Sequence, residues 1–315
     1  MSKRLGWFFA IVVTIAYSTN APIARGVILA GMSPVTLLSG RFLLAVLLYS
    51  VTLSVLPVRN AGGGRPLDRF GFWVGVGSGL INGFMMTAFF TVLETVSASI
   101  ASMASVALVQ LFTLGLLFLR SEPITLRHSL RWLVGMAGLY MVIGLGGSAD
   151  AFGLLLLVVG AALYSIHVVS VQWFLKPYNT WTITTLLVIS ATIAIIIVWV
   201  VTGAETYVPA PTGWIAILFL GIFATYIGRI LTYSAINRIG SGQFVLLTPL
   251  ETSLTIVWSV IFLGERLTPL QWLGTFFILM SILLAADAVW RPLQRMFFSK
   301  ILSTGDGYGA YDEGR

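Results

Sequence analysis

Residues 240–268 read GSGQFVLLTPLETSLTIVWSVIFLGERLT, and residues 97–125 read SASIASMASVALVQLFTLGLLFLRSEPIT. The two stretches align at a constant offset of 143 residues without a gap. Each begins with a patch of small residues, continues as a long apolar run and ends in Glu-x-x-Thr, so that Glu122 aligns with Glu265. The chain therefore contains an internal duplication, and its fold has to accommodate two copies of one unit.

The composition indicates that both copies lie in a membrane. Of the 315 residues, 58% are hydrophobic and only 9% are charged, whereas a soluble domain carries about 25% charged residues. No long polar segment suggests a soluble second domain. The chain has no cysteine, which excludes disulfides and thiolate metal sites. The apolar run from Leu5 is too long for the core of a signal peptide, so we interpret it as the first span.

Ten apolar segments have the length that a membrane-spanning helix needs. They are predicted at residues 5–29, 35–57, 70–92, 96–118, 130–147, 152–174, 180–202, 212–237, 243–263 and 269–290. The predicted fold is an all-α integral membrane protein with ten transmembrane helices. Its parts are a first five-helix repeat at 5–147, a second five-helix repeat at 152–290 and a polar cytoplasmic tail at 291–315.

The basic residues predict how these spans are oriented. Ten spans put both termini on one side, and the loops and ends of that side hold 14 of the 18 Lys and Arg residues. Because basic loops stay in the cytoplasm, both termini are predicted to be cytoplasmic. An odd number of spans per copy also turns the second copy upside down relative to the first. Inverted repeats of this kind surround a central cavity in transporters and expose a site near the midplane to either side.

A second motif links the repeat to chemistry. Tyr17-Ser-Thr-Asn20 in the first span and Tyr164-Ser-Ile-His167 in the sixth are 147 residues apart. A Tyr and a polar residue three positions later share a helix face, and polar groups within a membrane should face the protein interior. We therefore expect Tyr17, Asn20, Tyr164 and His167 to line the cavity. His167 could relay a proton near neutral pH, or it could be a satisfied hydrogen-bond partner.

Ionisable residues in the second half extend the candidate site. Arg229 lies three residues after Tyr226 and four before Tyr233, so a regular helix would present all three side chains on one face. Arg229 could bind a substrate carboxylate while the tyrosines stack on the rest of the substrate, or it could be a structural residue paired with Glu251. Glu251 could carry a coupling proton or bind a substrate ammonium, or it could belong to a fixed ion pair.

The remaining candidates have gating or structural interpretations. Pro22 and Pro249 each remove a backbone hydrogen bond within a span and are predicted hinges or gates. Arg41 opens the second span, where snorkelling or a structural pair is expected, and Arg25 could snorkel or guard the cavity mouth. No metal site is predicted, because His128 lies in a loop and no second ligand has a suitable spacing. Glycines at every fourth position of the third span predict a packing seam: Gly71, Gly75, Gly79 and Gly83.

LTPLET at 247–252 and FLGERLTPLQWLG at 262–274 resemble the second repeat of EamA-type transporters of the drug/metabolite transporter superfamily. MSPVTL at 32–37 and RFLLA at 41–45 resemble the first loop and second span of that family. Arg25-Gly26, shortly after Tyr-Ser-Thr, is similar to the branch that exports amino acids, including aromatic ones. The resemblance covers roughly residues 5–290.

The resemblance implies a ten-span basket in the bacterial inner (plasma) membrane that exports solutes without ATP, which fits the lack of a GxxxxGK[ST] loop. We predict a secondary transporter for amino acids or related metabolites, with no cofactor. Its expected partners are the small-molecule substrate and membrane lipid. Anionic lipid and the basic loops explain the net charge of +7 without nucleic acid.

The sequence leaves two other functions open. A lipid flippase or channel-like protein is one alternative, and a membrane-embedded enzyme is another, which the lack of a DDxxD or HExxH motif disfavours. The exact substrate, proton coupling, the direction of transport and the oligomeric state stay open, with a monomer as the working prediction.

Overall fold

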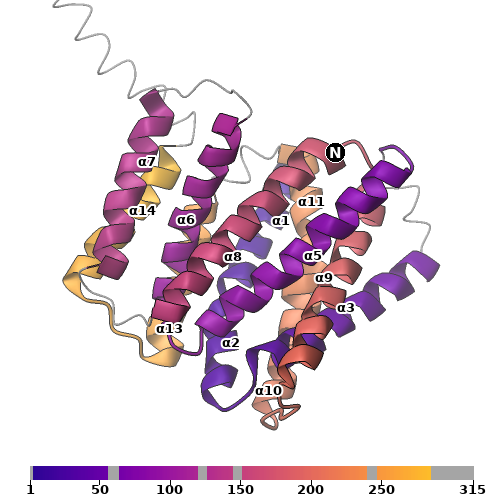
Figure 1. The fold of residues 1–315 in the computed structure, drawn as a ribbon, viewed down its shortest axis with the longest axis horizontal. Helices are drawn as coiled ribbons and strands as arrows, with labels where there is room; N and C mark the ends of the chain where they lie inside the picture. The colour runs from indigo at the N-terminus through magenta and orange to yellow at the C-terminus, as the bar shows by residue number, and fades with distance from the viewer. Residues whose placement is uncertain (1–2, 56–63, 120–125, 145–150, 240–246, 285–315) are drawn as a thin grey trace, which may run out of the picture.

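The computed structural model describes residues 3–55, 64–119, 126–144, 151–239 and 247–284. These residues fold into helices, and their one bridge of β type is an isolated contact between Arg65 and Tyr178. The chain is therefore all-helical over its described part, as predicted (Figure 1).

The first half of the chain forms these helices: α1 (Lys3–Ser18), α2 (Asn20–Leu29), α3 (Pro34–Val55), α5 (Arg69–Val92), α6 (Ala98–Leu119), α7 (Leu126–Leu139) and the π-helical η1 (Tyr140–Gly144). The second half forms α8 (Ala151–Ser170), η2 (Val171–Leu175), α9 (Thr180–Thr202), α10 (Thr212–Phe219), η3 (Leu220–Ile227), α11 (Gly228–Ile239), α13 (Thr248–Leu263) and α14 (Pro269–Leu283). Both η2 and η3 are π-helical.

Within the described residues, six helical segments are long and apolar enough to cross a membrane: Lys3–Leu29, Pro34–Val55, Arg69–Val92, Ala151–Leu175, Thr180–Thr202 and Thr212–Thr232. Three shorter apolar helices accompany them, at Ala98–Thr113, Leu133–Val142 and Leu250–Leu263. These segments indicate a multi-pass membrane protein. The count of ten spans and their division into five plus five remain predictions.

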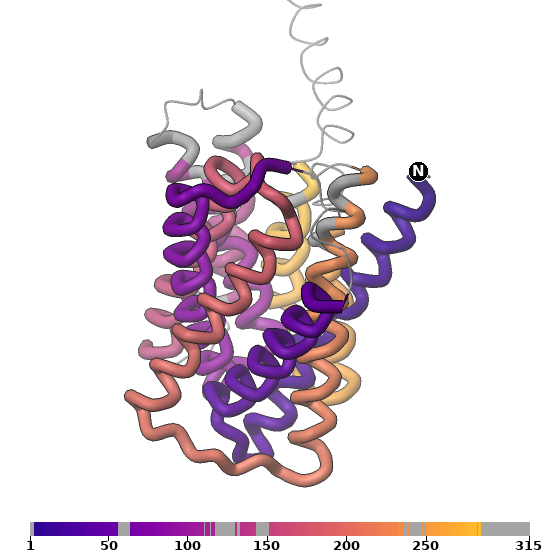
Figure 2. The backbone as a smooth tube through the Cα atoms, turned by 90° about the vertical axis from the view of Figure 1, so that its right-hand side faces the viewer, coloured from indigo at the N-terminus to yellow at the C-terminus, as the bar shows by residue number. Residues whose placement is uncertain are grey.

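Helices from the two halves of the chain interleave. α5 packs along α8 and α9, α3 packs along α9 and η3, and α1 packs along α11. α7 and α14 lie side by side at one edge of the molecule (Figure 1). The helices run in the same general direction at different tilts (Figure 2). One large apolar core joins residues of both halves, including Phe42, Leu93, Leu157 and Leu220.

The glycines of α5 form the predicted packing seam, and its partner is α9. A Cβ atom added to Gly79 would lie 2.5 Å from Cβ of Ser190, and one added to Gly83 would lie 2.5 Å from the carbonyl oxygen of Ala191. Distances this short mean that the two backbones touch, as small residues allow in membrane helices. The seam fixes α9 against the helix that carries Ser78 and Asn82.

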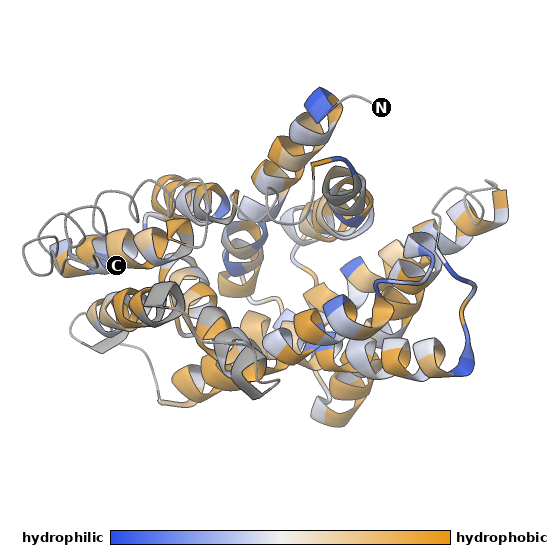
Figure 3. Cartoon of the chain, turned by 90° about the horizontal axis from the view of Figure 1, so that it is seen from above, coloured by the Kyte–Doolittle hydropathy of each residue, from blue (hydrophilic) through white to orange (hydrophobic). Residues whose placement is uncertain are grey.

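Hydrophobic residues occur along most of the helices (Figure 3). Large hydrophobic residues on several helices are strongly exposed, among them Leu47, Val201 and Phe262. Buried hydroxyl groups meanwhile bond back to their own helix, as Thr14 Oγ1 does to the carbonyl of Ala10 at 2.8 Å. This distribution suits a protein surrounded by acyl chains, where polar groups need internal partners.

Candidate functional site

The first predicted span is interrupted next to the tyrosine motif, where α1 ends at Ser18 and α2 begins at Asn20. Pro22 has no backbone N–H, so it leaves the carbonyl of Ser18, four residues earlier, without its helical partner. Thr255 Oγ1 of α13 lies 3.0 Å from that carbonyl and 3.0 Å from the carbonyl of Glu251 in its own helix, and Trp258 Nε1 donates to Ser18 Oγ at 3.0 Å. Pro22 thus coincides with a break in the helix that α13 stabilises.

Tyr17 and Asn20 flank this break. The ring of Tyr17 packs on Gly228 of α11, where an added Cβ would lie 2.6 Å from Cε1 of the ring. The Tyr17 hydroxyl lies 3.2 Å from Oγ1 of Thr232, also on α11. Asn20 Oδ1 is buried and accepts no hydrogen bond from the described residues. The first-span motif therefore lies inside the bundle, against α11.

A π-helical segment, η3, precedes α11. Within it, Thr225 Oγ1 donates to the carbonyl of Leu220, five residues back, at 3.0 Å. Tyr226 at its end turns toward α3, where its ring meets Tyr49 edge-on with centroids 5.0 Å apart, and its hydroxyl bonds to Oγ1 of Thr52. Single π-helical segments are frequent at functional sites, because they change the direction of the side chains that follow.

Arg229 reaches a different helix from Tyr226. Its Nη2 donates to Oδ1 of Asn82 in the middle of α5 at 3.2 Å. Tyr226 and Arg229, which are predicted to share a face, thus contact different helices, α3 and α5. The side chain of Tyr233, the third member, lies outside the described residues. Asn82, a buried amide, is thus an additional member of the site.

Arg41 is a second cation in this region, and its environment differs from the expectation. The side chain is only 3% exposed, so it does not snorkel to the surface. Nε donates to Oγ1 of Thr225 at 3.0 Å, and Cζ lies 5.5 Å from the ring centroid of Phe42 and 5.3 Å from that of Phe90. No described carboxylate pairs with Arg41, and its Nη1 is buried without a hydrogen-bond partner in the described part of the chain.

His167 ties α8 to α5. Nδ1 of the ring lies 3.0 Å from the carbonyl oxygen of Ser78 and 2.8 Å from its hydroxyl oxygen. A carbonyl can only accept, so the proton of a neutral ring belongs on Nδ1, which leaves Nε2 as an acceptor. The ring of Tyr164 stacks on that of His167 with centroids 6.3 Å apart, and Tyr164 is 38% exposed. Of the two interpretations of His167, these contacts fit the satisfied hydrogen-bond partner.

Glu251 lies apart from Arg229. It occupies the first turn of α13, where it is partly buried. The hypothesis of an Arg229–Glu251 ion pair is wrong, because no such pair forms between these two described residues.

Pro249 also lies in the first turn of α13, a position that proline favours because its missing N–H is not needed there. Pro249 therefore starts a helix rather than kinking one, and its side chain lies outside the described residues.

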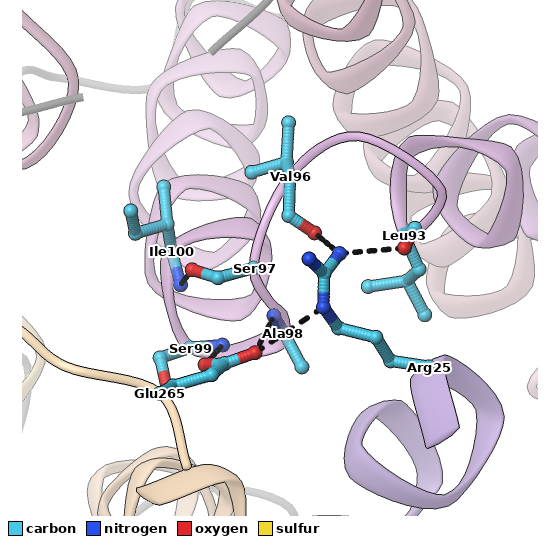
Figure 4. Close-up of polar contacts among 8 residues, drawn as sticks. All are labelled: Arg25, Leu93, Val96, Ser97, Ala98, Ser99, Ile100 and Glu265. Carbon is cyan, nitrogen blue, oxygen red and sulfur yellow. Dashed lines mark hydrogen bonds and ion pairs between the residues drawn. The ribbon is translucent and has the colours of Figure 1, made fainter. Parts of the chain in front are cut away.

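One end of the bundle is joined by an ion pair (Figure 4). Nε of Arg25, on α2, lies 3.4 Å from Oε1 of Glu265, in the turn after α13. Nη1 of Arg25 donates to the carbonyl of Leu93 at 2.6 Å and to that of Val96. Glu265 also accepts hydrogen bonds from the first N–H groups of α6, at 2.7 and 3.0 Å. Arg25 thus joins three segments of the chain rather than snorkelling outward.

Sequence reasoning missed Ser78, Thr225 and Thr232, whose hydroxyls contact side chains of the site. Hydroxyl residues are common in apolar helices, where they bond to their own backbone, so residue type alone gave no signal. The repeat could have identified two of them, because Ser78 and Thr225 are 147 residues apart, the same offset that relates Tyr17 to Tyr164.

Known proteins resemble this chain in two ways: a solved structure has a similar fold, and a family model matches the second half of the chain. A solved structure described only as "Crystal structure of protein" has a TM-score of 0.64 and 17% sequence identity, over 93% of this chain and 100% of that one. That likeness concerns the fold alone. No curated protein matches the chain. Residues 151–286, less than half of the chain, match the model of the EamA-like transporter family. Over that part of the chain, the match supports the drug/metabolite transporter superfamily that the sequence resembles.

Proposed function

We propose that this protein is a secondary transporter of the EamA type that exports amino acids or related metabolites across the bacterial inner membrane by alternating access. The observation that carries the proposal is the hydrogen bond that Arg229 of α11, a partly buried side chain, donates to the buried amide of Asn82 on α5. An ionisable residue in such a place is unfavourable for stability, and its usual reason is contact with a substrate or an ion.

The packing of the helices supports an inverted repeat. In the proposed repeat, α1 corresponds to α8, and α5 corresponds to α11. Exchanging the two halves therefore turns the pairing of α5 with α8 into the pairing of α11 with α1, and both pairings occur. Asn82 and Arg229 are themselves 147 residues apart, the offset that relates Tyr17 to Tyr164. The bond between them would then lie close to the pseudo-two-fold axis, where a symmetric carrier places its substrate.

Two features suit the gating that alternating access requires. The break at Ser18 lets α1 and α2 change their mutual angle, because the backbone bond that would resist bending is replaced by one to Thr255. The ion pair between Arg25 and Glu265 holds α2, α6 and the turn after α13 together at one end. Breaking that pair would release this end while the other end closes.

Solute flux in proteoliposomes tests the proposal. Radiolabelled amino acids would be loaded inside, and their exit measured with and without a pH gradient. R229Q should abolish most of the flux, whereas R238Q should retain it, because Arg238 on the same helix bonds to the carbonyl of Ser234 and stacks on Phe9. Absence of flux for every amino acid would contradict the amino-acid assignment, and lipid scrambling without solute flux would favour a flippase.

The same assay addresses proton coupling. If Glu251 carries the coupling proton, E251Q should remove the effect of a pH gradient on flux while leaving downhill exchange. H167Q makes the equivalent test for His167. A pH gradient that has the same effect on both variants as on the unmodified protein would exclude both residues from proton transfer.

A further inference from the structure

Arg41 and Arg229 bring two positive charges to one region of the bundle interior. Arg41, on α3, bonds to Thr225, and Arg229, four residues after Thr225, bonds to Asn82. Thr225 and Arg229 are one helical turn apart, and the ring of Tyr17 packs on Gly228 between them. The region therefore carries a concentrated positive charge between α3, α5 and α11.

No described carboxylate balances these charges. Asp68, Glu94, Glu205, Glu251 and Glu265 are the acidic residues in the described part of the chain, and none forms an ion pair with Arg41 or Arg229. Guanidinium groups do not lose their proton in proteins, so the charges persist. Two like charges in a medium of low dielectric constant repel one another strongly. An anion bound in this region would offset that repulsion.

The geometry of Arg41 also points to a ligand. Nε is used by Thr225, and the rings of Phe42 and Phe90 flank the guanidinium group. Nη1, in a side chain that is 3% exposed, has no acceptor among the described residues. A planar guanidinium presents its N–H groups as a fork that matches the oxygens of a carboxylate or a phosphate. The missing acceptor is therefore of the kind that an anionic group provides.

We propose that Arg41 and Arg229 jointly bind the anionic group of the transported solute, a carboxylate or a phosphate, and that this group is the part of the substrate that the site selects. The inference rests on the proposed transport function and sharpens its substrate class. Arg41 becomes a binding residue rather than a structural one.

Thermal unfolding of the purified protein in detergent tests the binding, with matched phenyl compounds as probes. These are 3-phenylpropionate, phenyl phosphate, phenylalanine and phenethylamine, titrated at constant ionic strength. We expect saturable stabilisation by 3-phenylpropionate, by phenyl phosphate or by both, and none by phenethylamine, which carries only a positive charge. The first two probes distinguish a carboxylate site from a phosphate site. Stabilisation by phenethylamine alone, or by no anionic probe, would overturn the proposal.

Variants assign the effect to the two arginines. R41Q and R229Q should each weaken binding of the anionic probe roughly tenfold to hundredfold, the range for one charged hydrogen bond, whereas R238Q should bind as tightly as the unmodified protein. R41K keeps the charge without the fork and should bind with intermediate affinity, which provides a second test if R41Q does not fold. Equal affinity in R41K, R229Q and the unmodified protein would refute the site.

Flux measurements separate this inference from the transport proposal. Flux of a cationic or neutral solute that is insensitive to R41K and R229Q would keep the transporter and eliminate its anion selectivity. Saturable, arginine-dependent binding of an anion with no flux of that anion would keep the anion site and contradict the transport of that anion.

Discussion

Glu265 in the turn after α13 and Arg25 on α2 form an ion pair with an Nε–Oε1 distance of 3.4 Å, and the same carboxylate caps α6. The first N–H groups of a helix have no partner within it, and the helix dipole places positive charge there. Oε1 and Oε2 accept from the N–H groups of Ala98 and Ser99. Glu265 therefore caps α6 from a distant part of the chain, a role that a residue next to the helix usually has. Both side chains are largely buried, with exposures of 14% and 8%.

Replacing Glu265→Gln should destabilise the protein by about 1–3 kcal/mol, because the charge that Arg25 and the α6 terminus need is lost. Thermal unfolding in detergent measures the change. E94Q is the matched control, since Glu94 is exposed in the neighbouring α5–α6 turn and forms no ion pair with a described residue. Similar melting temperatures for E265Q and E94Q would mean that the capping of α6 by Glu265 contributes little to stability.

The same substitution should open one end of the bundle more often. Because the chain has no cysteine, a single Asn20→Cys residue at the break between α1 and α2 reports access to the interior. We expect a membrane-impermeant maleimide to label N20C faster in the E265Q background than in the E94Q background. Equal rates would show that the ion pair does not restrict access to Asn20.

Much of the fold could be predicted from the sequence, because apolar length and small-residue spacing act locally. The glycine seam of α5 is one example, since a repeat of four residues places every glycine on one face whatever lies opposite. The partner of that face, α9, could not be predicted, because it depends on contacts far apart in the chain.

The site was harder to predict for the same reason. Arg229 and Tyr17 were identified as polar groups in apolar spans, and both lie in the interior. The pairing of Arg229 with Asn82 instead of Glu251 depends on contacts between helices that are far apart in the chain. Snorkelling or a structural pair is predicted for Arg41, because it opens a predicted span. The packing of α3 against η3 instead buries it without a described carboxylate partner.

The bond from Thr255 to the carbonyl of Ser18 should stabilise the break that Pro22 creates. T255V removes the donor and leaves a buried carbonyl without a partner, at a cost of about 1–3 kcal/mol. T255S keeps the hydroxyl and is the control. If T255V and T255S unfold at the same temperature, another group must satisfy the carbonyl of Ser18.

The contact between α5 and α9 should reject even one added methyl group. In G83A the new Cβ would meet the carbonyl of Ala191 at 2.5 Å, and overpacking of this kind typically costs about 1–3 kcal/mol. G77A is the control on the same helix, because a Cβ at Gly77 meets nothing within 4 Å. Alanine also favours a helix over glycine by about 1 kcal/mol, so G77A should be neutral or stabilising. Equal loss of stability in both variants would indicate a general effect on α5.

Acid should destabilise the end of the bundle at which α5 starts. Asp68 Oδ1 accepts hydrogen bonds from the N–H of Gly71 at 2.6 Å and from the hydroxyl of Tyr178 at 2.8 Å. The bond from Gly71, followed by that from Tyr178, lowers the pKa of Asp68 below its ordinary value. A lowered folded-state pKa means that the ionised form adds stability above the unfolded value of about 4, and that this contribution is lost as the pH falls through the folded-state pKa.

The D68N variant isolates this contribution, because asparagine still caps a helix but does not titrate. The melting temperature of the unmodified protein should exceed that of D68N between about pH 5 and 7, where Asp68 is ionised in both states. The difference should shrink as the pH falls below about 4, where Asp68 becomes protonated in the unfolded chain. Y178F should show a smaller pH-dependent change, since it removes one of the bonds that lower the pKa. A difference between the unmodified protein and D68N that stays constant from pH 7 to 3 would show that the charge of Asp68 does not stabilise the start of α5.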